Sequence, residues 1–222
     1  MKKIVLTFTF FCLPLISLFS QNLAGKRIYN GNFSMNLSTV STDGSVTSAS
    51  SKNSNFALSA TLLTGKIREN NTYTAYGFNV IINTVSTPQV SNGSVVNASS
   101  SLYSIGPAIQ FGKFVKVFDQ FYYAPNSTFS VSGKFGSSGI SANGSTSTTL
   151  NSGGFGARAN ISPLNFIYQV NDNFLLSMNL GAVGMSYDYL KSSTDNFSTT
   201  SNNLSIYGSV TNFSGIGAYY LF

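Results

Sequence analysis

Few side chains in this sequence could carry out chemistry, and the commonest catalytic one is missing. The 222 residues contain no histidine, the usual general base of hydrolases. An acid pair for glycoside hydrolysis, or a zinc site, would need several carboxylates in one cleft. The six carboxylates are instead far apart in the sequence: Asp43, Glu69, Asp119, Asp172, Asp188 and Asp195. We therefore expect no enzymatic activity, no metal site and no cofactor.

Three charged residues could act inside the fold. Lys134 and Arg158 occupy the polar positions of alternating segments, so both should face the same side as the Asn, Ser and Thr residues around them. An isolated buried cation is costly, and Asp188 is the candidate partner if a bulge changes the parity of its segment. Two interpretations remain open for these lumen-facing charges: a plug that fills a narrow interior, or a constriction that selects anions.

β-Strands must position these charges, because the main periodicity of the sequence is two. Hydrophobic residues alternate with Asn, Ser, Thr and Gly in about eight segments, so each strand has one apolar and one polar face. The apolar sets begin at Tyr29, Phe56, Tyr76, Tyr103, Phe129, Phe155, Phe174 and Ile216. Alternation alone does not decide whether the apolar face points inward, as in a soluble barrel, or outward, as in a membrane barrel.

The connections between these segments alternate in length. Short turns are expected at residues 65–70, 116–120 and 170–173, and long Ser/Thr/Asn/Gly-rich linkers at residues 40–53, 86–98, 136–150 and 191–203. The short turns recur about every 50 residues, which gives a strand–long loop–strand unit repeated four times. Outer-membrane barrels have this arrangement, with short periplasmic turns and longer extracellular loops.

The distribution of side chains favours an apolar face in lipid. The polar positions carry Asn, Ser and Thr rather than Lys and Glu, and the other charges lie near segment ends. An aromatic girdle is expected beside the short turns, formed by Phe114, Phe118, Phe121, Tyr122, Tyr123, Phe166, Tyr168 and Phe174. The sequence therefore predicts an all-β, eight-stranded antiparallel up-and-down transmembrane β-barrel with short periplasmic turns and four long extracellular loops.

Irregularities are expected at four places in these strands. Pro107, Pro125 and Pro163 fall in or beside strands of a barrel that has no free edge, so bulges or strand ends should accommodate them. The apolar face changes parity after Leu180, which predicts a bulge in the Gly-containing residues 181–184.

The first 20 residues have the features of a cleaved signal peptide. Lys2 and Lys3 precede an apolar stretch at residues 4–19, and cleavage is expected after Ser20, which leaves residues 21–222 as the barrel domain. The only cysteine, Cys12, lies in this segment, so the exported chain would have no disulfide. Loss of the two lysines lowers the formal charge from +6 to +4, too small and dispersed to indicate nucleic-acid binding.

The end of the sequence, GIGAYYLF, alternates Ile216, Ala218, Tyr220 and Phe222. Together with the strand–turn–strand at residues 161–181, it resembles the small eight-stranded outer-membrane β-barrel proteins of Gram-negative bacteria. The resemblance implies a porin-like integral protein of the outer membrane that contacts lipid. It also implies that the terminal pattern is a signal read by the barrel-assembly machinery. It implies fold and location more than activity.

Three functions are open at this point. The leading one is a monomeric structural or surface-interaction protein whose polar loops contact an external ligand or host surface. The first alternative is a narrow channel or small-solute transporter. The second is a secreted soluble barrel that binds a ligand with its apolar face inside.

Overall fold

The computed structural model describes residues 23–42, 51–91, 94–142, 145–194 and 197–222. The predicted signal peptide, with Cys12 and its cleavage site, lies outside the described residues. Among the described residues, no helix is long and apolar enough to span a membrane.

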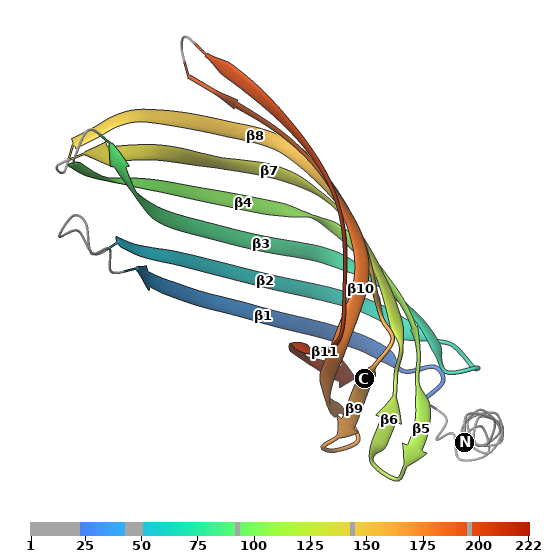
Figure 1. The fold of residues 1–222 in the computed structure, drawn as a ribbon. Coiled ribbons are helices and arrows are strands. Elements are labelled where there is room, and N and C mark those ends of the chain that lie inside the picture. Colours follow the sequence, from blue (N-terminus) through green and yellow to red (C-terminus); the bar gives the residue numbers. More distant parts are fainter. Residues whose placement is uncertain (1–22, 43–50, 92–93, 143–144, 195–196) are drawn as a thin grey trace, which may run out of the picture.

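The described chain is built from antiparallel β-strands (Figure 1). Their bounds are β1 Arg27–Thr42, β2 Ser51–Ile67, β3 Thr72–Ser91, β4 Ser94–Lys113, β5 Val115–Phe118, β6 Phe121–Tyr123, β7 Asn126–Ala142, β8 Ser145–Ser162, β9 Asn165–Gln169, β10 Phe174–Ser193 and β11 Ser198–Leu221. The short strands β5, β6 and β9 continue β4, β7 and β8 at the short-turn end, so the strand order of the chain reduces to eight long segments.

These eight segments form a ring, which confirms the predicted fold. The order of hydrogen-bonded neighbours is β1-β2-β3-β4-β7-β8-β10-β11, and β11 returns to β1. The closing ladder runs from the pair Ile28–Leu221 to the pair Phe33–Ile216. Ring closure therefore lies in the half of the barrel nearest the short turns. Along the rest of β11 the pairing is with β10.

Proline and glycine positions interrupt the strands as the sequence suggests, with one difference. Pro125 and Pro163 lie between strands. Pro107 lies within β4, where two positions lack a pair on β7 but the register is the same on either side, so no bulge forms there. The missing N–H of proline explains the gap in this ladder. At Gly181, which has a φ of 85°, the β10–β11 register shifts and the predicted bulge is present.

The polar linkers differ from the expected irregular loops. Three of them continue as strands, and their hairpins are paired up to Ser91–Ser94, Ala142–Ser145 and Ser193–Ser198. Antiparallel pairing satisfies the backbone of these Ser- and Thr-rich segments, which leaves only short connections at the tips. The fourth connection, residues 43–50, lies outside the described residues. The polar segments thus form long hairpins at the end opposite the short turns.

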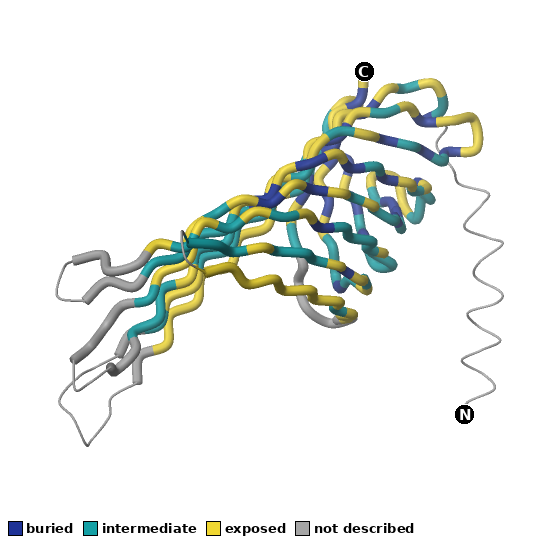
Figure 2. Tube along the Cα trace, turned by 90° about the horizontal axis from the view of Figure 1, so that it is seen from above, coloured by how far each residue is buried: buried dark blue, intermediate teal, exposed yellow. Residues whose placement is uncertain are grey.

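Burial is concentrated at the short-turn end (Figure 2). The fully buried large side chains there include Leu23, Ile28, Ile67 and Leu175. Beyond Phe33, both faces of β1 are exposed as far as Val40. Among the described residues, the barrel is consequently packed at the short-turn end and open toward the hairpins.

Candidate functional site

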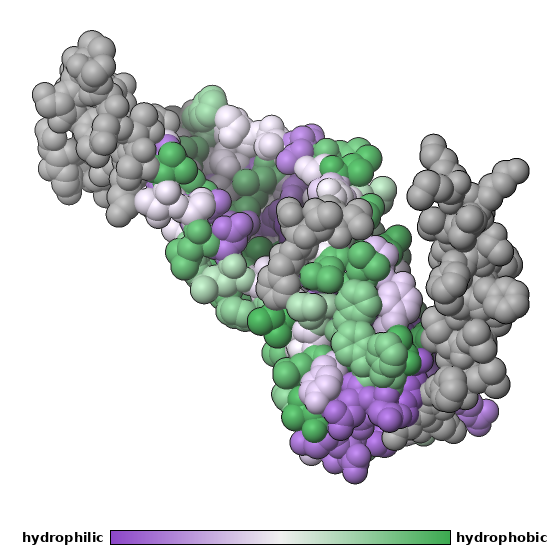
Figure 3. Space-filling model, turned by 60° about the horizontal axis from the view of Figure 1, so that its bottom comes forward, coloured by the Kyte–Doolittle hydropathy of each residue, from purple (hydrophilic) through white to green (hydrophobic). Residues whose placement is uncertain are grey.

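The outer face of the barrel is apolar. Leu62, Phe78 and Ile216 are 69%, 64% and 59% exposed, although they lie within paired strands. Their neighbours of opposite parity, such as Asn79 and Gly217, face the lumen. Figure 3 shows hydrophobic residues over the body of the barrel and a hydrophilic cluster at its bottom. Above the short-turn end, the apolar face of each strand therefore points outward, and the polar face lines the interior.

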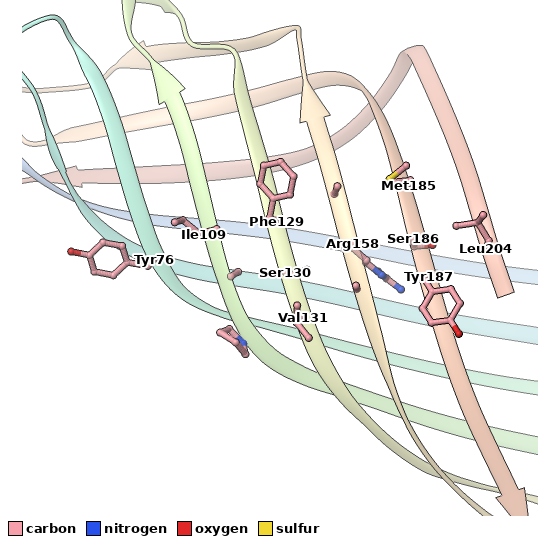
Figure 4. A pocket seen from close by; sticks show the side chains of 14 residues that line it. Tyr76, Ile109, Phe129, Ser130, Val131, Arg158, Met185, Ser186, Tyr187 and Leu204 are labelled. Atoms are coloured by element: carbon pink, nitrogen blue, oxygen red, sulfur yellow. The ribbon is translucent and has the colours of Figure 1, made fainter. Parts of the chain in front are cut away.

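Figure 4 shows one of the hydrophobic depressions on this outer surface. Phe129, Val131, Met185 and Tyr187 surround it, where the small side chains of β8 leave room. Most of its lining has the outward parity of β7, β8 and β10, so it is part of the apolar outer surface, although Ser130, Arg158 and Ser186 also border it.

The interior is closed at the short-turn end by four aromatic rings. Tyr73, Phe114, Tyr122 and Tyr219 are each 1% exposed. The centroid of the Phe114 ring lies 5.1 Å from that of Tyr73 and 5.7 Å from that of Tyr219. The Tyr122 ring meets Phe114 edge-on at 6.4 Å. We call these four residues the aromatic floor.

The aromatic floor corrects part of the predicted girdle. Phe114 and Tyr122 were expected at the lipid interface because they adjoin a short turn, but both point into the lumen. The alternation already indicated this. Phe111 and Phe129 face outward, and Phe114 and Tyr122 are an odd number of positions away from them in the sequence, which places them on the opposite face. The alternation, rather than closeness to the turn, was the signal to follow.

The other six girdle residues are not among the buried core. Phe118 and Tyr168 are exposed, and the remaining four are half-buried. The Phe121 ring stacks on Phe166 at 5.8 Å, and Tyr123 lies 6.0 Å from Phe166. The set is Phe118, Phe121, Tyr123, Phe166, Tyr168 and Phe174. The inward-facing positions are even-numbered in β8 and odd-numbered in β9, where Asn165 and Ile167 are buried. The change occurs at the break around Pro163.

Gln110 separates the aromatic floor from the lumen above it. Its Oε1 accepts hydrogen bonds from Asn30 Nδ2 at 2.5 Å and from the Tyr73 hydroxyl at 3.3 Å. Its Nε2 donates to Asn126 Oδ1 at 3.1 Å and to Thr128 Oγ1 at 3.2 Å. This buried amide therefore uses both ends of its side chain to join β1, β3, β4 and β7.

Lys134 and Asp188 form an ion pair inside the lumen. The distance from Lys134 Nζ to Asp188 Oδ1 is 2.5 Å, and the side chains are 6% and 24% exposed. The two residues lie on β7 and β10, which both pair with β8 and are not neighbours of each other. Gly156 of β8 lies between them, and a Cβ atom there would meet both side chains. The structure thus brings together two of the three charges singled out in the sequence.

Arg158, the third charge, is not part of this ion pair. No described residue makes an ion pair or side-chain hydrogen bond with it. It lines a polar cavity of about 200 Å³, to which each of the eight ring strands contributes. Asn160, Tyr207, Thr61 and Asn79 are among the lining residues. We call this space the lumen cavity.

The four residues of the terminal pattern lie in the segment of β11 that pairs with β1, or, for Phe222, directly after it. Ile216, Tyr220 and Phe222 point outward, and Ala218 is half-buried. The Phe222 ring stacks on Tyr29 at 4.8 Å. The backbones of Phe222 and Arg27 exchange hydrogen bonds of 2.9 and 3.1 Å. These contacts join the two ends of the barrel sheet.

The described residues include no group of three or more Cys, Asp or Glu residues close enough to hold a metal ion. The candidate functional site is the lumen, with its aromatic floor, its ion pair and the lumen cavity that Arg158 lines.

Comparison with known proteins gives similarity at the level of solved structures. No family model matches the sequence, and no curated protein matches it. Neisserial surface protein A is 17% identical, with 90% of this chain and 98% of that chain covered and a TM-score of 0.35. The outer membrane protein OprG from Pseudomonas aeruginosa is 14% identical, with 90% and 96% covered and a TM-score of 0.44. Ail, the attachment invasion locus protein of Yersinia pestis, is 13% identical, with 90% and 99% covered and a TM-score of 0.32.

Proposed function

We propose that this chain is an integral β-barrel of a bacterial outer membrane whose polar hairpins present a surface for contact with external partners. One observation carries the proposal: large apolar side chains of the ring face outward, while amides and hydroxyls line the interior above the aromatic floor. Water would penalise such a surface, since apolar area is stabilised by removal from water. A bilayer makes the same surface favourable and requires every backbone group to pair, as a closed ring allows.

The polar hairpins support a surface role. They extend the strands beyond the apolar region, and their residues are mainly Ser, Thr, Asn and Gly. Such a surface is neutral and rich in hydrogen-bonding groups, as suits recognition of another polar surface. A structural or adhesive role fits this arrangement without any catalytic group.

The alternative of a narrow channel is less well supported. The aromatic floor and the Gln110 hydrogen bonds fill the interior near the short turns, and a barrel of this strand number has little room between its side chains. The alternative of a soluble ligand-binding barrel needs an apolar interior, whereas the lumen cavity is lined mainly by polar residues.

The test is whether the folded protein needs an amphiphile. We expect the purified chain to fold only with detergent or lipid, to migrate differently on gels before and after boiling, and to fractionate with outer membranes. Recovery of a folded, water-soluble monomer from the periplasm would contradict the proposal.

A further inference from the structure

We infer that the lumen cavity is a binding site for a small oxyanion, held by Arg158 and reached from the hairpin end. The inference goes beyond the proposed surface role, because it assigns a ligand to the interior. It depends on the barrel fold but not on any partner of the hairpins.

Among the described residues, the charges of the lumen leave one cation, Arg158, without an ion-pair partner. Lys134 and Asp188 neutralise each other at 2.5 Å. Asp188 is the one carboxylate that the described strands place inside the lumen, and no carboxylate lines the cavity. Arg158 therefore contributes a full positive charge to a space whose other polar groups are neutral. An unpaired charge in a partly desolvated site favours an anionic ligand.

The groups around Arg158 suit an oxyanion. A guanidinium presents several N–H donors in a planar fork, which matches the oxygens of a carboxylate or phosphate. The Tyr207 hydroxyl bonds to the side chain of Asn160, which lies two residues from Arg158 on the same face of β8. This bond orients the Asn160 amide and leaves its N–H donors available to a ligand. All three residues are on paired strands, so the site is positioned before a ligand arrives.

Size and access restrict the class of ligand. A volume of about 200 Å³ is small beside typical drug-sized pockets of roughly 300–1,000 Å³. Gln110 forms the boundary of the cavity toward the aromatic floor, which closes the route from the short-turn end. Ser34 and Ser59 line the cavity on strands that continue toward the open hairpin end. The ligand is therefore a soluble anion of the size of phosphate or a short carboxylate, and it enters from the outside.

The experiment is a titration of the folded full-length protein with inorganic phosphate, followed by NMR. The protein is held in an uncharged maltoside detergent, so that no lipid phosphate competes. We expect saturable shifts of the Arg158 side-chain Nε–H and of the Asn160 and Tyr207 backbone amides. A short carboxylate should displace phosphate from the same residues, because both ligands use the same guanidinium.

Variants separate a built site from general attraction to a basic protein. Arg158→Gln should raise the dissociation constant for phosphate by on the order of tenfold to a hundredfold, as expected for loss of charge-assisted hydrogen bonds. Lys66→Gln removes the same charge from an exposed position and should leave binding unchanged. Arg158→Lys keeps the charge without the fork, and should bind with intermediate affinity. Altered gel migration on boiling checks that each variant is folded.

Two results would overturn the inference. One is a wild-type protein, shown to be folded, whose Arg158 and Asn160 signals do not move with phosphate. The other is equal loss of binding in Arg158→Gln and Lys66→Gln, which would assign the effect to net charge. Both outcomes leave the proposed membrane location intact, because folding in detergent is measured separately.

Discussion

Lys134 and Asp188 meet directly across Gly156, the residue of β8 that separates their two strands. The Nζ–Oδ1 distance is 2.5 Å. A Cβ atom on Gly156 would lie 2.6 Å from Asp188 Oδ1 and 2.7 Å from Lys134 Cε. The ion pair therefore exists because a strand between the partners carries no side chain at this point. A glycine in β8 thus allows a residue of β7 and a residue of β10 to neutralise each other.

Removal of the carboxylate should be costly. Asp188→Asn leaves the buried Lys134 ammonium without its counterion, and breaking a buried pair costs roughly 3–5 kcal/mol. We expect a decrease in the free energy of unfolding near the lower end of this range, since Asp188 is 24% exposed. Urea unfolding in lipid vesicles measures it. Lys116→Gln, which removes a partner of the exposed Asp119, is the control and should have no measurable effect.

Gly156→Val should destabilise the barrel by pushing the two charged side chains apart. The control is Gly153→Ala in the same strand, where an added Cβ meets nothing within 4 Å. A double-mutant cycle tests the cause: in the Asp188→Asn background, Gly156→Val should cost much less than in the wild type. Additive effects would show that Gly156 acts on the backbone rather than on the ion pair.

The aromatic floor should stabilise and seal the barrel. Phe114→Ala removes a ring that is 1% exposed, and large-to-small changes of this kind cost about 3–5 kcal/mol. Phe118→Ala changes a ring that is 70% exposed and should lower the urea midpoint far less. Planar-bilayer recordings provide the second measurement. The wild type should be silent, and steady wild-type conductance would contradict a sealed floor.

An arginine introduced on the outer face tests whether this face contacts lipid or water. Leu62 and Thr39 are both exposed, so in water an arginine at either position would change stability little. In a bilayer, Leu62→Arg should destabilise the barrel by about 2–4 kcal/mol if it lies near the midplane, whereas Thr39→Arg in the polar hairpin region should be neutral. Equal, small effects measured in lipid vesicles would argue against the proposed membrane location.

Phe222 should matter for assembly more than its partly exposed ring suggests. Its backbone exchanges two hydrogen bonds with Arg27, and its ring stacks on Tyr29, so it joins β11 to β1. We expect Phe222→Ala to slow insertion into the membrane, seen as a larger unfolded fraction on unboiled gels. Phe197→Ala, which changes an exposed ring beyond the closing ladder, is the control. Normal insertion of Phe222→Ala would remove the proposed role of the terminal pattern.

Much of the barrel could be predicted from the sequence, because a period of two assigns each side chain to a face. The outward positions of Phe33 and Phe78 and the inward positions of Lys134 and Arg158 follow directly from alternation. The bulge at Gly181 was also visible, since the apolar set changes parity across it. Absence of histidine and spacing of the acids were properties of the sequence alone.

Only the tertiary structure decided what meets inside the ring. The sequence offered Asp188 as a partner for Lys134 or Arg158, and its pairing with Lys134 depends on β8 lying between two strands that are far apart in sequence. The aromatic floor depends on Tyr73, Phe114, Tyr122 and Tyr219 reaching one level of the barrel from different strands, which the stagger of neighbouring strands sets. Local periodicity fixes which face of its strand a residue occupies. The level of that residue along the barrel axis, and therefore which residues of other strands it meets, depends on the register of the closed sheet. For this reason the sequence determined the inside and the outside, and the structure determined the floor, the choice of Lys134 as the partner of Asp188, and the lumen cavity.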